Sequence, residues 1–167
     1  MATMAETFMI EGGGRFSVST TDIQAQEEFC ARWKNPVFAF CRMFLGDGTT
    51  AEELTCEVLL AFCRQRSWRL DDRELLPRAL GFALRAANKY RTESSRPMHS
   101  GSQLEVALRD LPHLERAVVI MRNLLRMDWE SIALASDLSQ AQAHQIWKRG
   151  FIQLTELLQR GLSKEGH

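Results

Sequence analysis

The sequence predicts an all-α protein made of two small helical domains joined by a short linker. Leu, Ala, Arg and Glu are abundant among the 167 residues, whereas Val, Ile, Thr and Tyr, which favour strands, are sparse. Apolar residues recur at three- and four-residue steps in several separate stretches, and this is the period of an amphipathic helix. Hydrophobic residues make up 45% and charged residues 25% of the chain, the composition of a folded globular protein.

The domain boundary is predicted from one polar stretch. Residues 92–103 (TESSRPMHSGSQ) contain four Ser, one Pro and one Gly with little apolar content, which is typical of a linker. We therefore expect a loosely ordered tail over 1–22, a first domain over 23–91, this linker, and a second domain over 104–162.

The first domain is predicted to contain three helices. Pro36 lies inside the first apolar pattern and predicts a kink or a break near Asn35. Thr50 and Glu53 have the spacing of a capping box and predict the start of the second helix. The third helix runs from Glu74 to about Arg91. The apolar faces are formed by Phe29, Trp33, Val37, Phe40 and Phe44 in the first helix, by Leu54, Val58, Ala61 and Phe62 in the second, and by Leu75, Ala79, Phe82, Ala83 and Ala86 in the third.

The second domain begins with a helix over 104–111 and continues after Pro112, which suits a first helical position. The inner face of the helix after Pro112 is expected to consist of Ala117, Val118, Met121, Leu124 and Leu125.

A helix-turn-helix follows in the sequence. Asp128 is suited to cap a short helix that carries Ile132 and Ala135, a tight turn follows at residues 137–139, and Ser139 with Gln142 forms a second capping box. The inner positions of the closing helix are Ala143, Ile146, Trp147, Gly150, Leu154 and Leu157. In DNA-binding proteins the second helix of this motif enters the major groove. An ordinary helical hairpin has the same pattern, so the motif alone leaves DNA binding open.

Charge is unevenly distributed along a chain of zero net charge. Residues 1–60 carry four Lys or Arg and nine Asp or Glu, whereas residues 61–91 carry eight basic and three acidic side chains. Such a division suits a protein that contacts a polyanion with one surface and a basic protein with another. Solvated helix faces of differing charge are the alternative explanation.

The four cysteines and four histidines show no metal-ligand spacing, so no metal or cofactor is expected. There is no nucleophile with a neighbouring base and no phosphate-binding loop, so we do not expect an enzyme. A leader peptide and a membrane span are not expected either, and reduced thiols in a cytoplasmic protein are the simplest interpretation. Cys56 and Cys63, two helical turns apart, are the alternative as a redox-sensitive pair.

Taken in order, the two domains resemble a bacterial extracytoplasmic-function (ECF) sigma factor, a subunit that directs RNA polymerase to particular promoters. Residues 45–60 (LGDGTTAEELTCEVLL) resemble the "lgd..dAEDLvQevFl" run of its region 2, and residues 80–91, with Asn88, resemble the end of that region. Residues 111–122 resemble the opening of region 4, and residues 129–135 and 139–154 resemble its helix-turn-helix. The resemblance covers about residues 29–158.

This resemblance implies three surfaces and three partners. The acidic helix would bind the β′ clamp helices of core RNA polymerase, and region 4 would contact the β flap. Region 2 would capture the −10 element of promoter DNA, region 4 would read the −35 element, and an anti-sigma factor is expected as a regulator. The implied polymerase-binding residues are Glu52, Glu53, Cys56, Glu57 and Leu60. The implied DNA-binding residues are Trp68, Arg78, Arg85, Asn88, Lys89 and Arg91 in region 2, and Ser139, Gln140, Gln142, His144, Gln145, Lys148 and Arg149 in region 4. For Trp68, base stacking and partial packing remain equally good alternatives.

Several positions depart from the family pattern. Cys56 replaces the usual Gln, and residues 141–143 (AQA) replace the usual Gly-Thr-Val, with no Lys or Arg in the next turn. Gly150 replaces an Ala and is expected to destabilise the helix by up to about 1 kcal/mol. Because phosphate neutralisation supplies much of DNA affinity, a second hypothesis is a sigma-like interaction module that has lost specific DNA reading.

Overall fold

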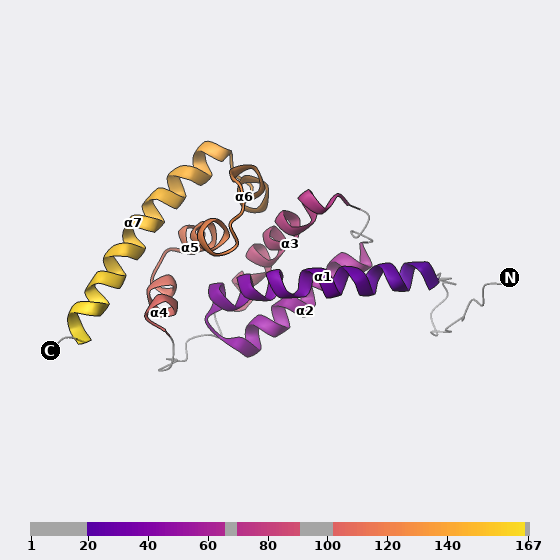
Figure 1. Cartoon of the computed structure of the whole chain (residues 1–167), viewed down its shortest axis with the longest axis horizontal. Coiled ribbons are helices and arrows are strands. Elements are labelled where there is room, and N and C mark those ends of the chain that lie inside the picture. The colour runs from indigo at the N-terminus through magenta and orange to yellow at the C-terminus, as the bar shows by residue number, and fades with distance from the viewer. Residues whose placement is uncertain (1–19, 66–69, 91–101, 166–167) are drawn as a thin grey trace.

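The computed structural model describes residues 20–65, 70–90 and 102–165, and all the secondary structure in this part of the chain is helical. The all-α prediction is confirmed. The elements are α1 (Thr20–Leu45), α2 (Gly48–Arg64), α3 (Asp72–Ala86), the 3-10 turn η2 (Ala87–Tyr90), α4 (Gln103–Arg109), α5 (His113–Val119), the π turn η3 (Ile120–Leu124), α6 (Trp129–Ser136) and α7 (Gln140–Glu165) (Figure 1).

Helix α1 continues through Pro36, so of the kink or break expected near Asn35 the break does not occur. Proline removes the amide that would bond to the carbonyl of Arg32. Beyond this point, however, Val37, Phe40 and Phe44 are almost completely buried. The burial of these side chains keeps the second half of the helix on the core.

Helix α2 starts earlier than predicted, and its cap is a different residue. Asp47 is the N-cap, and its Oδ2 accepts hydrogen bonds from the Thr50 amide at 2.7 Å and the Thr50 hydroxyl at 2.6 Å. These bonds hold the pKa of Asp47 below its ordinary value, because they favour the carboxylate. The predicted capping box of Thr50 and Glu53 is therefore wrong: Thr50 already lies in the first turn.

The π turn after α5 changes which side chains face the core. The Leu125 amide donates to the Ile120 carbonyl at 3.1 Å, a five-residue step that inserts one extra residue into the helical turn. Leu124, predicted to lie inside, is instead 44% exposed, and Val119 and Ile120 are buried. The prediction for Leu124 assumed an uninterrupted 3.6-residue period, and this assumption was wrong.

The helix-turn-helix forms as predicted. The Asp128 carboxylate accepts from the Ser131 amide at 2.7 Å and caps α6, which ends where Asp137 adopts a left-handed conformation. Ser139 and Gln142 exchange hydrogen bonds of 3.2 and 2.9 Å, so their capping box is confirmed.

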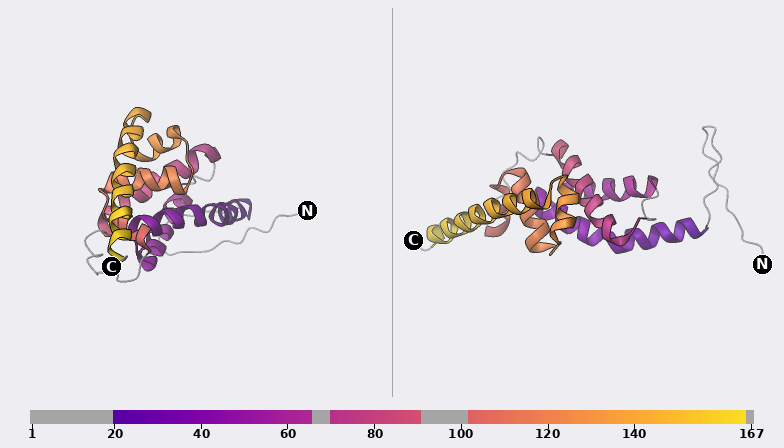
Figure 2. Two further views of the ribbon diagram at one scale, coloured as in Figure 1. Left: turned by 60° about the vertical axis from the view of Figure 1, so that its left-hand side comes forward. Right: turned by 90° about the horizontal axis from the view of Figure 1, so that it is seen from above.

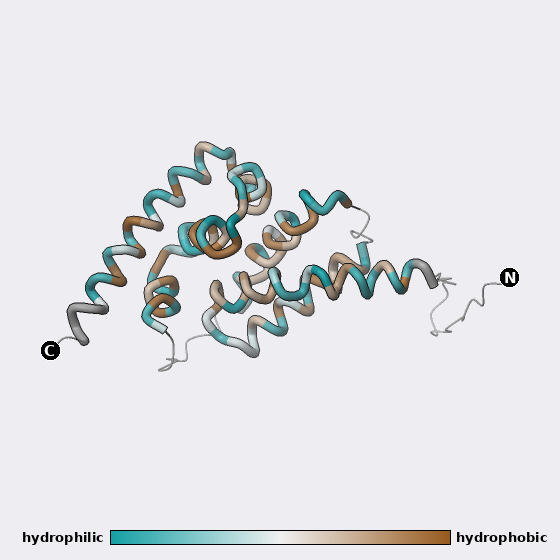
Figure 3. Tube along the Cα trace, viewed as in Figure 1, coloured by the Kyte–Doolittle hydropathy of each residue, from teal (hydrophilic) through white to brown (hydrophobic). Residues whose placement is uncertain are grey.

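The two halves pack against each other around one hydrophobic core. Helix α3 lies beside α6 in the middle of the molecule (Figures 1 and 2). The approach is close, because a Cβ at Gly81 of α3 would lie 2.7 Å from the Ala135 carbonyl oxygen of α6. The most continuous apolar stretch lies on α5 and η3 at the centre (Figure 3), where residues 117–121 are all buried.

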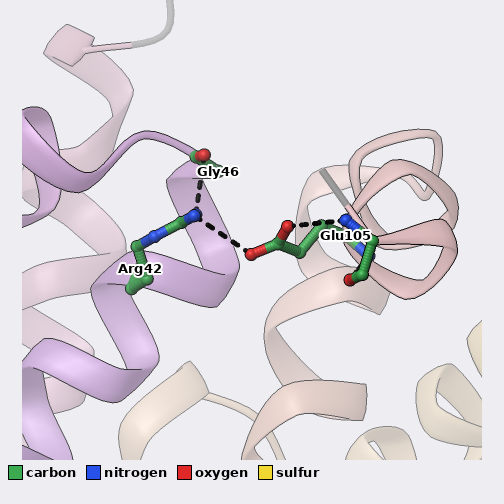
Figure 4. Close-up of polar contacts among 4 residues, drawn as sticks. Arg42, Gly46 and Glu105 are labelled. Atoms are coloured by element: carbon green, nitrogen blue, oxygen red, sulfur yellow. Dashed lines mark hydrogen bonds and ion pairs between the residues drawn. The ribbon is translucent and has the colours of Figure 1, made fainter. Parts of the chain in front are cut away.

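Polar contacts also join the halves. The Arg42 guanidinium at the end of α1 donates to the Gly46 carbonyl at 2.7 Å and forms an ion pair of 3.1 Å with Glu105 of α4 (Figure 4). Arg116 of α5 donates to the carbonyls of Phe44, Leu111 and Arg109. One guanidinium thus binds the end of α1 to the α4–α5 connection. Of the predicted linker, residues 92–101 lie outside the described residues, and Ser102 caps α4 in a capping box with Glu105.

Candidate polymerase and nucleic-acid interfaces

The predicted polymerase-binding residues share one face of α2. Residues 52, 53, 56, 57 and 60 lie at three- and four-residue steps, which places them along one side of the helix. Glu52, Glu53 and Cys56 are exposed, and Leu60 is 55% exposed, a high value for a large apolar side chain. A shallow hollow of about 530 Å³ follows this face and is lined by Glu53, Cys56, Glu57, Leu60, Ala61, Arg64 and Phe82. The apolar residues of this hollow have carboxylates on the side of Glu53 and Glu57 and a guanidinium at Arg64, which suits a partner that presents an apolar side chain with a basic one beside it.

Glu57 connects this face to a residue predicted to bind DNA. Its carboxylate accepts a 3.0 Å hydrogen bond from the Tyr90 hydroxyl and forms an ion pair with Lys89. The Lys89 ammonium also lies 4.9 Å from the centre of the Tyr90 ring. Hydrogen bonding to Glu57 raises the pKa of Lys89, while burial and then Glu57 raise that of Tyr90. Lys89 thus holds η2 on α2, and its charge is partly balanced in this conformation.

The basic side of α3 is only partly available. Arg78 binds Glu74 through two nitrogens, at 3.1 and 2.9 Å, in an exposed ion pair one turn long. Arg85 and Asn88 are exposed, as a polyanion contact requires. The Arg85 guanidinium reaches to within 3.4 Å of the Cβ position of Gly81, beside the contact between α3 and α6. Trp68 and Arg91, the other residues predicted to contact the −10 element, lie outside the described residues.

All the residues predicted to read the −35 element lie at the exposed start of α7 and the turn before it. Ser139, Gln140, Gln142, His144, Gln145, Lys148 and Arg149 are exposed. Gln142 and Ser139 also cap the helix, and Arg149 forms a 3.3 Å ion pair with Glu115 of α5. Of these residues, Lys148 and Arg149 are the cationic ones at neutral pH, and only Lys148 has no ion pair in this region of the described chain. A shallow, mainly apolar hollow of about 370 Å³ lies along the same turns, lined by Leu138, Ala141, Gln142, Gln145, Ile146 and Arg149.

A row of aromatic side chains joins α6 to α7. The His144 ring meets Trp129 edge-on at 5.0 Å, and Trp147 stacks on Phe151 at 5.2 Å. The Trp147 indole N–H donates to Asn123 at 2.7 Å, which orients its ring. Trp147 is half-buried, consistent with its predicted inner position, and Trp129 is half-buried as well. Phe151, which is 39% exposed, was missed, although its four-residue spacing from Trp147 is visible in the sequence.

Gly150 is explained by close packing. A Cβ at this position would lie 2.9 Å from the Cβ of Glu115 and 3.1 Å from a methyl group of Val119. The structure gives a reason for a glycine at this position that helix propensity does not: its lack of a Cβ allows α7 to approach α5.

The fold has a close match among solved structures. The sigma factor RpoE of Bartonella quintana, solved in complex with the anti-sigma factor NepR, superposes with a TM-score of 0.67. The match covers 80% of this chain and 96% of that chain at 14% sequence identity. The chain has the fold of a sigma factor. At the level of sequence alone, no known family and no curated protein matches it.

The sigma fold gives the surfaces above a common framework. The α2 face belongs to the first half, the exposed start of α7 belongs to the second, and α3 with α6 forms the contact between them. Among the described helices, none is both long and apolar enough to cross a membrane.

Proposed function

We propose that this protein is an ECF-type sigma factor. It binds core RNA polymerase through α2 and directs promoter-specific transcription initiation. The α3–η2 region contacts the −10 element, and the start of α7 contacts the −35 element. The observation that carries the proposal is the coincidence of the sigma fold with an exposed acidic and apolar face at residues 52–60 of α2.

The chemistry of α2 supports the polymerase contact. Leu60 is exposed and lines one hollow together with Ala61 and Phe82, so the apolar surface is shared by neighbouring residues of α2 and α3. The carboxylates of Glu53 and Glu57 at the same hollow steer a basic partner and the apolar residues supply contact area, so the two contributions can be tested separately.

Polymerase binding is tested with Glu53→Arg and Leu60→Asp, alone and combined. Glu57 is unsuitable because its substitution also removes the bonds to Lys89 and Tyr90. We expect each single variant to weaken binding to purified core polymerase by about tenfold or more, because Glu53→Arg presents a like charge to a basic partner and Leu60→Asp puts a charge into the apolar contact. Glu27→Arg, an exposed charge reversal on α1, is the matched control. Unchanged affinity of the double variant would contradict the proposed surface.

A second candidate function is favoured by the start of α7. Gln142 is engaged in a cap, Arg149 is paired with Glu115, and an apolar hollow lies along the same turns. These features suit protein docking better than phosphate contact. The alternative is thus a sigma-like interaction module in which the second half binds a protein and specific DNA reading is lost.

Run-off transcription with reconstituted holoenzyme distinguishes the two functions. Promoters are first selected from genomic DNA by the holoenzyme, and transcription is then measured with wild type and with Lys148→Ala. The sigma function predicts initiation at a defined promoter. It also predicts that Lys148→Ala lowers the transcript yield from that promoter, and that the difference between this variant and the wild type becomes smaller when the −35 element is scrambled. Binding to core polymerase without initiation at any selected promoter would support the alternative.

We further propose that an anti-sigma factor regulates the protein, on the basis of the complex in which the Bartonella quintana sigma factor was solved. Such a regulator is expected to bind the purified chain and to compete with core polymerase. A bound regulator that leaves polymerase affinity unchanged would rule out this mode of control.

A further inference from the structure

Two cysteine side chains from different helices are in contact. Cys30 of α1 and Cys63 of α2 are both free thiols, half-buried, and their Sγ atoms are 3.7 Å apart. A disulfide has a sulfur–sulfur distance of about 2.05 Å, so closure needs a movement of less than about 2 Å. Rotation about the two Cα–Cβ bonds is the movement that closure requires.

The neighbouring residues hold the two thiols in place. Phe29 and Phe62, each adjacent to one of the cysteines, stack with their ring centres 6.3 Å apart and an angle of 4° between the rings. Both rings are 5% exposed. This stacking fixes the register of α1 against α2, so the thiol contact belongs to the packed core and does not depend on a surface loop.

We propose that Cys30 and Cys63 form a modification site, a dithiol that hydrogen peroxide converts to a reversible disulfide. One thiol attacks peroxide, the O–O bond breaks, and a sulfenic acid and water form. The second thiol attacks the sulfenic sulfur, the S–S bond forms, and a second water leaves. Two thiols lose two protons and two electrons in total, and peroxide takes up both. A dithiol reductant reverses the change by thiol–disulfide exchange.

The other two cysteines do not share this arrangement. Cys56 is exposed on the α2 face, and Cys41 is fully buried, where burial raises its pKa to about 11. Burial, together with the Cys30 thiol, also raises the pKa of Cys63 to about 11. Because the thiolate is the reactive form, oxidation of the pair is slow at neutral pH and accelerates as the pH rises.

The bond would join the end of α2 to the middle of α1. Cys63 lies in the last turn of α2, and the two cysteines are 33 residues apart in sequence. A cross-link of this span removes freedom from the unfolded chain and is expected to raise the melting temperature by about 7–15 °C.

The full-length protein is treated with hydrogen peroxide at pH 7 and pH 9, alkylated, and digested without reduction. We expect an intact-mass loss of two hydrogens, one linked peptide pair that contains Cys30 and Cys63, and the higher melting temperature. Dithiothreitol should reverse all three changes. The reaction should be faster at pH 9.

Single substitutions complete the test. Cys30→Ser and Cys63→Ser should each abolish the mass loss and the thermal shift, whereas the matched control Cys56→Ser should retain both. The proposal is overturned if Cys30 and Cys63 stay open to alkylation while Cys56 is oxidised. It is equally overturned if either thiol proceeds to the sulfinic acid with no linked peptide.

Discussion

Gly81→Ala tests the contact between the two halves of the protein. The new Cβ would lie 2.7 Å from the carbonyl oxygen of Ala135 and 3.4 Å from the carbonyl carbon, so its closest contacts are with the backbone of α6. The Arg85 guanidinium, also 3.4 Å away, is the end of a flexible side chain and can move aside. Alanine favours the helix by about 1 kcal/mol relative to glycine. Overpacking costs about 1–3 kcal/mol, and a contact of 2.7 Å with a backbone oxygen places this site in the upper part of that range. We expect a net loss of about 1–2 kcal/mol, or a melting temperature lower by about 2–8 °C.

Urea unfolding monitored by tryptophan fluorescence measures this loss. Gly48→Ala is the matched control, because a Cβ there has no heavy atom within 4 Å, and its stability should be unchanged or higher by up to about 1 kcal/mol. Small-angle scattering should show a larger radius of gyration for Gly81→Ala if α3 moves away from α6. A Gly81→Ala protein as stable as the wild type, with an unchanged radius, would refute the close approach of the two helices.

Three further predictions concern single polar groups. Asp47→Ala should lower stability at pH 7 by about 1 kcal/mol through loss of the N-cap, and Asp47→Asn should retain most of it. Because the folded-state pKa of Asp47 lies below its ordinary value of 3.8, its ionised form adds stability above that value. Urea titrations from pH 7 to pH 2 should show this contribution being lost as the pH falls through the folded-state pKa; a pH-independent difference from Asp47→Ala would contradict it. Arg116→Lys should lower the free energy of unfolding by about 1–3 kcal/mol, because a lysine cannot bind three carbonyls with one planar group. Thermal unfolding measures this loss, and an unaltered melting temperature would show that the three hydrogen bonds of the guanidinium do not stabilise the fold. A double-mutant cycle of Arg42→Ala and Glu105→Gln should give a coupling of about 1 kcal/mol, and additive effects would mean that the pair contributes nothing.

The sequence was sufficient for the helices and for the helix-turn-helix because those features depend on local signals. Asp128, Ser139 and Gln142 act on amides within three residues, so their roles follow directly from spacing. Local signals predicted the wrong N-cap where two capping residues lie close together in the sequence. Asp47 and Thr50 are both good caps, and the sequence does not reveal that the Asp47 carboxylate binds both donors of Thr50.

Contacts between distant residues were not predictable from one sequence. The tight approaches at Gly81 and Gly150 depend on which helices become neighbours. Helix propensity alone predicts that these glycines destabilise their helices, and it does not show that they allow two helices to pack closely. The Cys30–Cys63 pair is a similar case, since spacing along one helix favoured Cys56 as the partner of Cys63. The residues of the two candidate interfaces were found on exposed faces, but their pairing, as between Glu57 and Lys89, required the packed structure.

The π turn at residues 120–124 has a consequence for how the chain tolerates changes in length. A deletion within a regular helix rotates everything downstream by about 100° relative to what precedes it. Here the backbone already accommodates one residue more than an α-helical turn needs, so removing one residue restores the ordinary 3.6-residue turn. Helices α6 and α7 would then keep their orientation on the core. Single-residue length differences among related chains should therefore accumulate at this turn and be rare in α5.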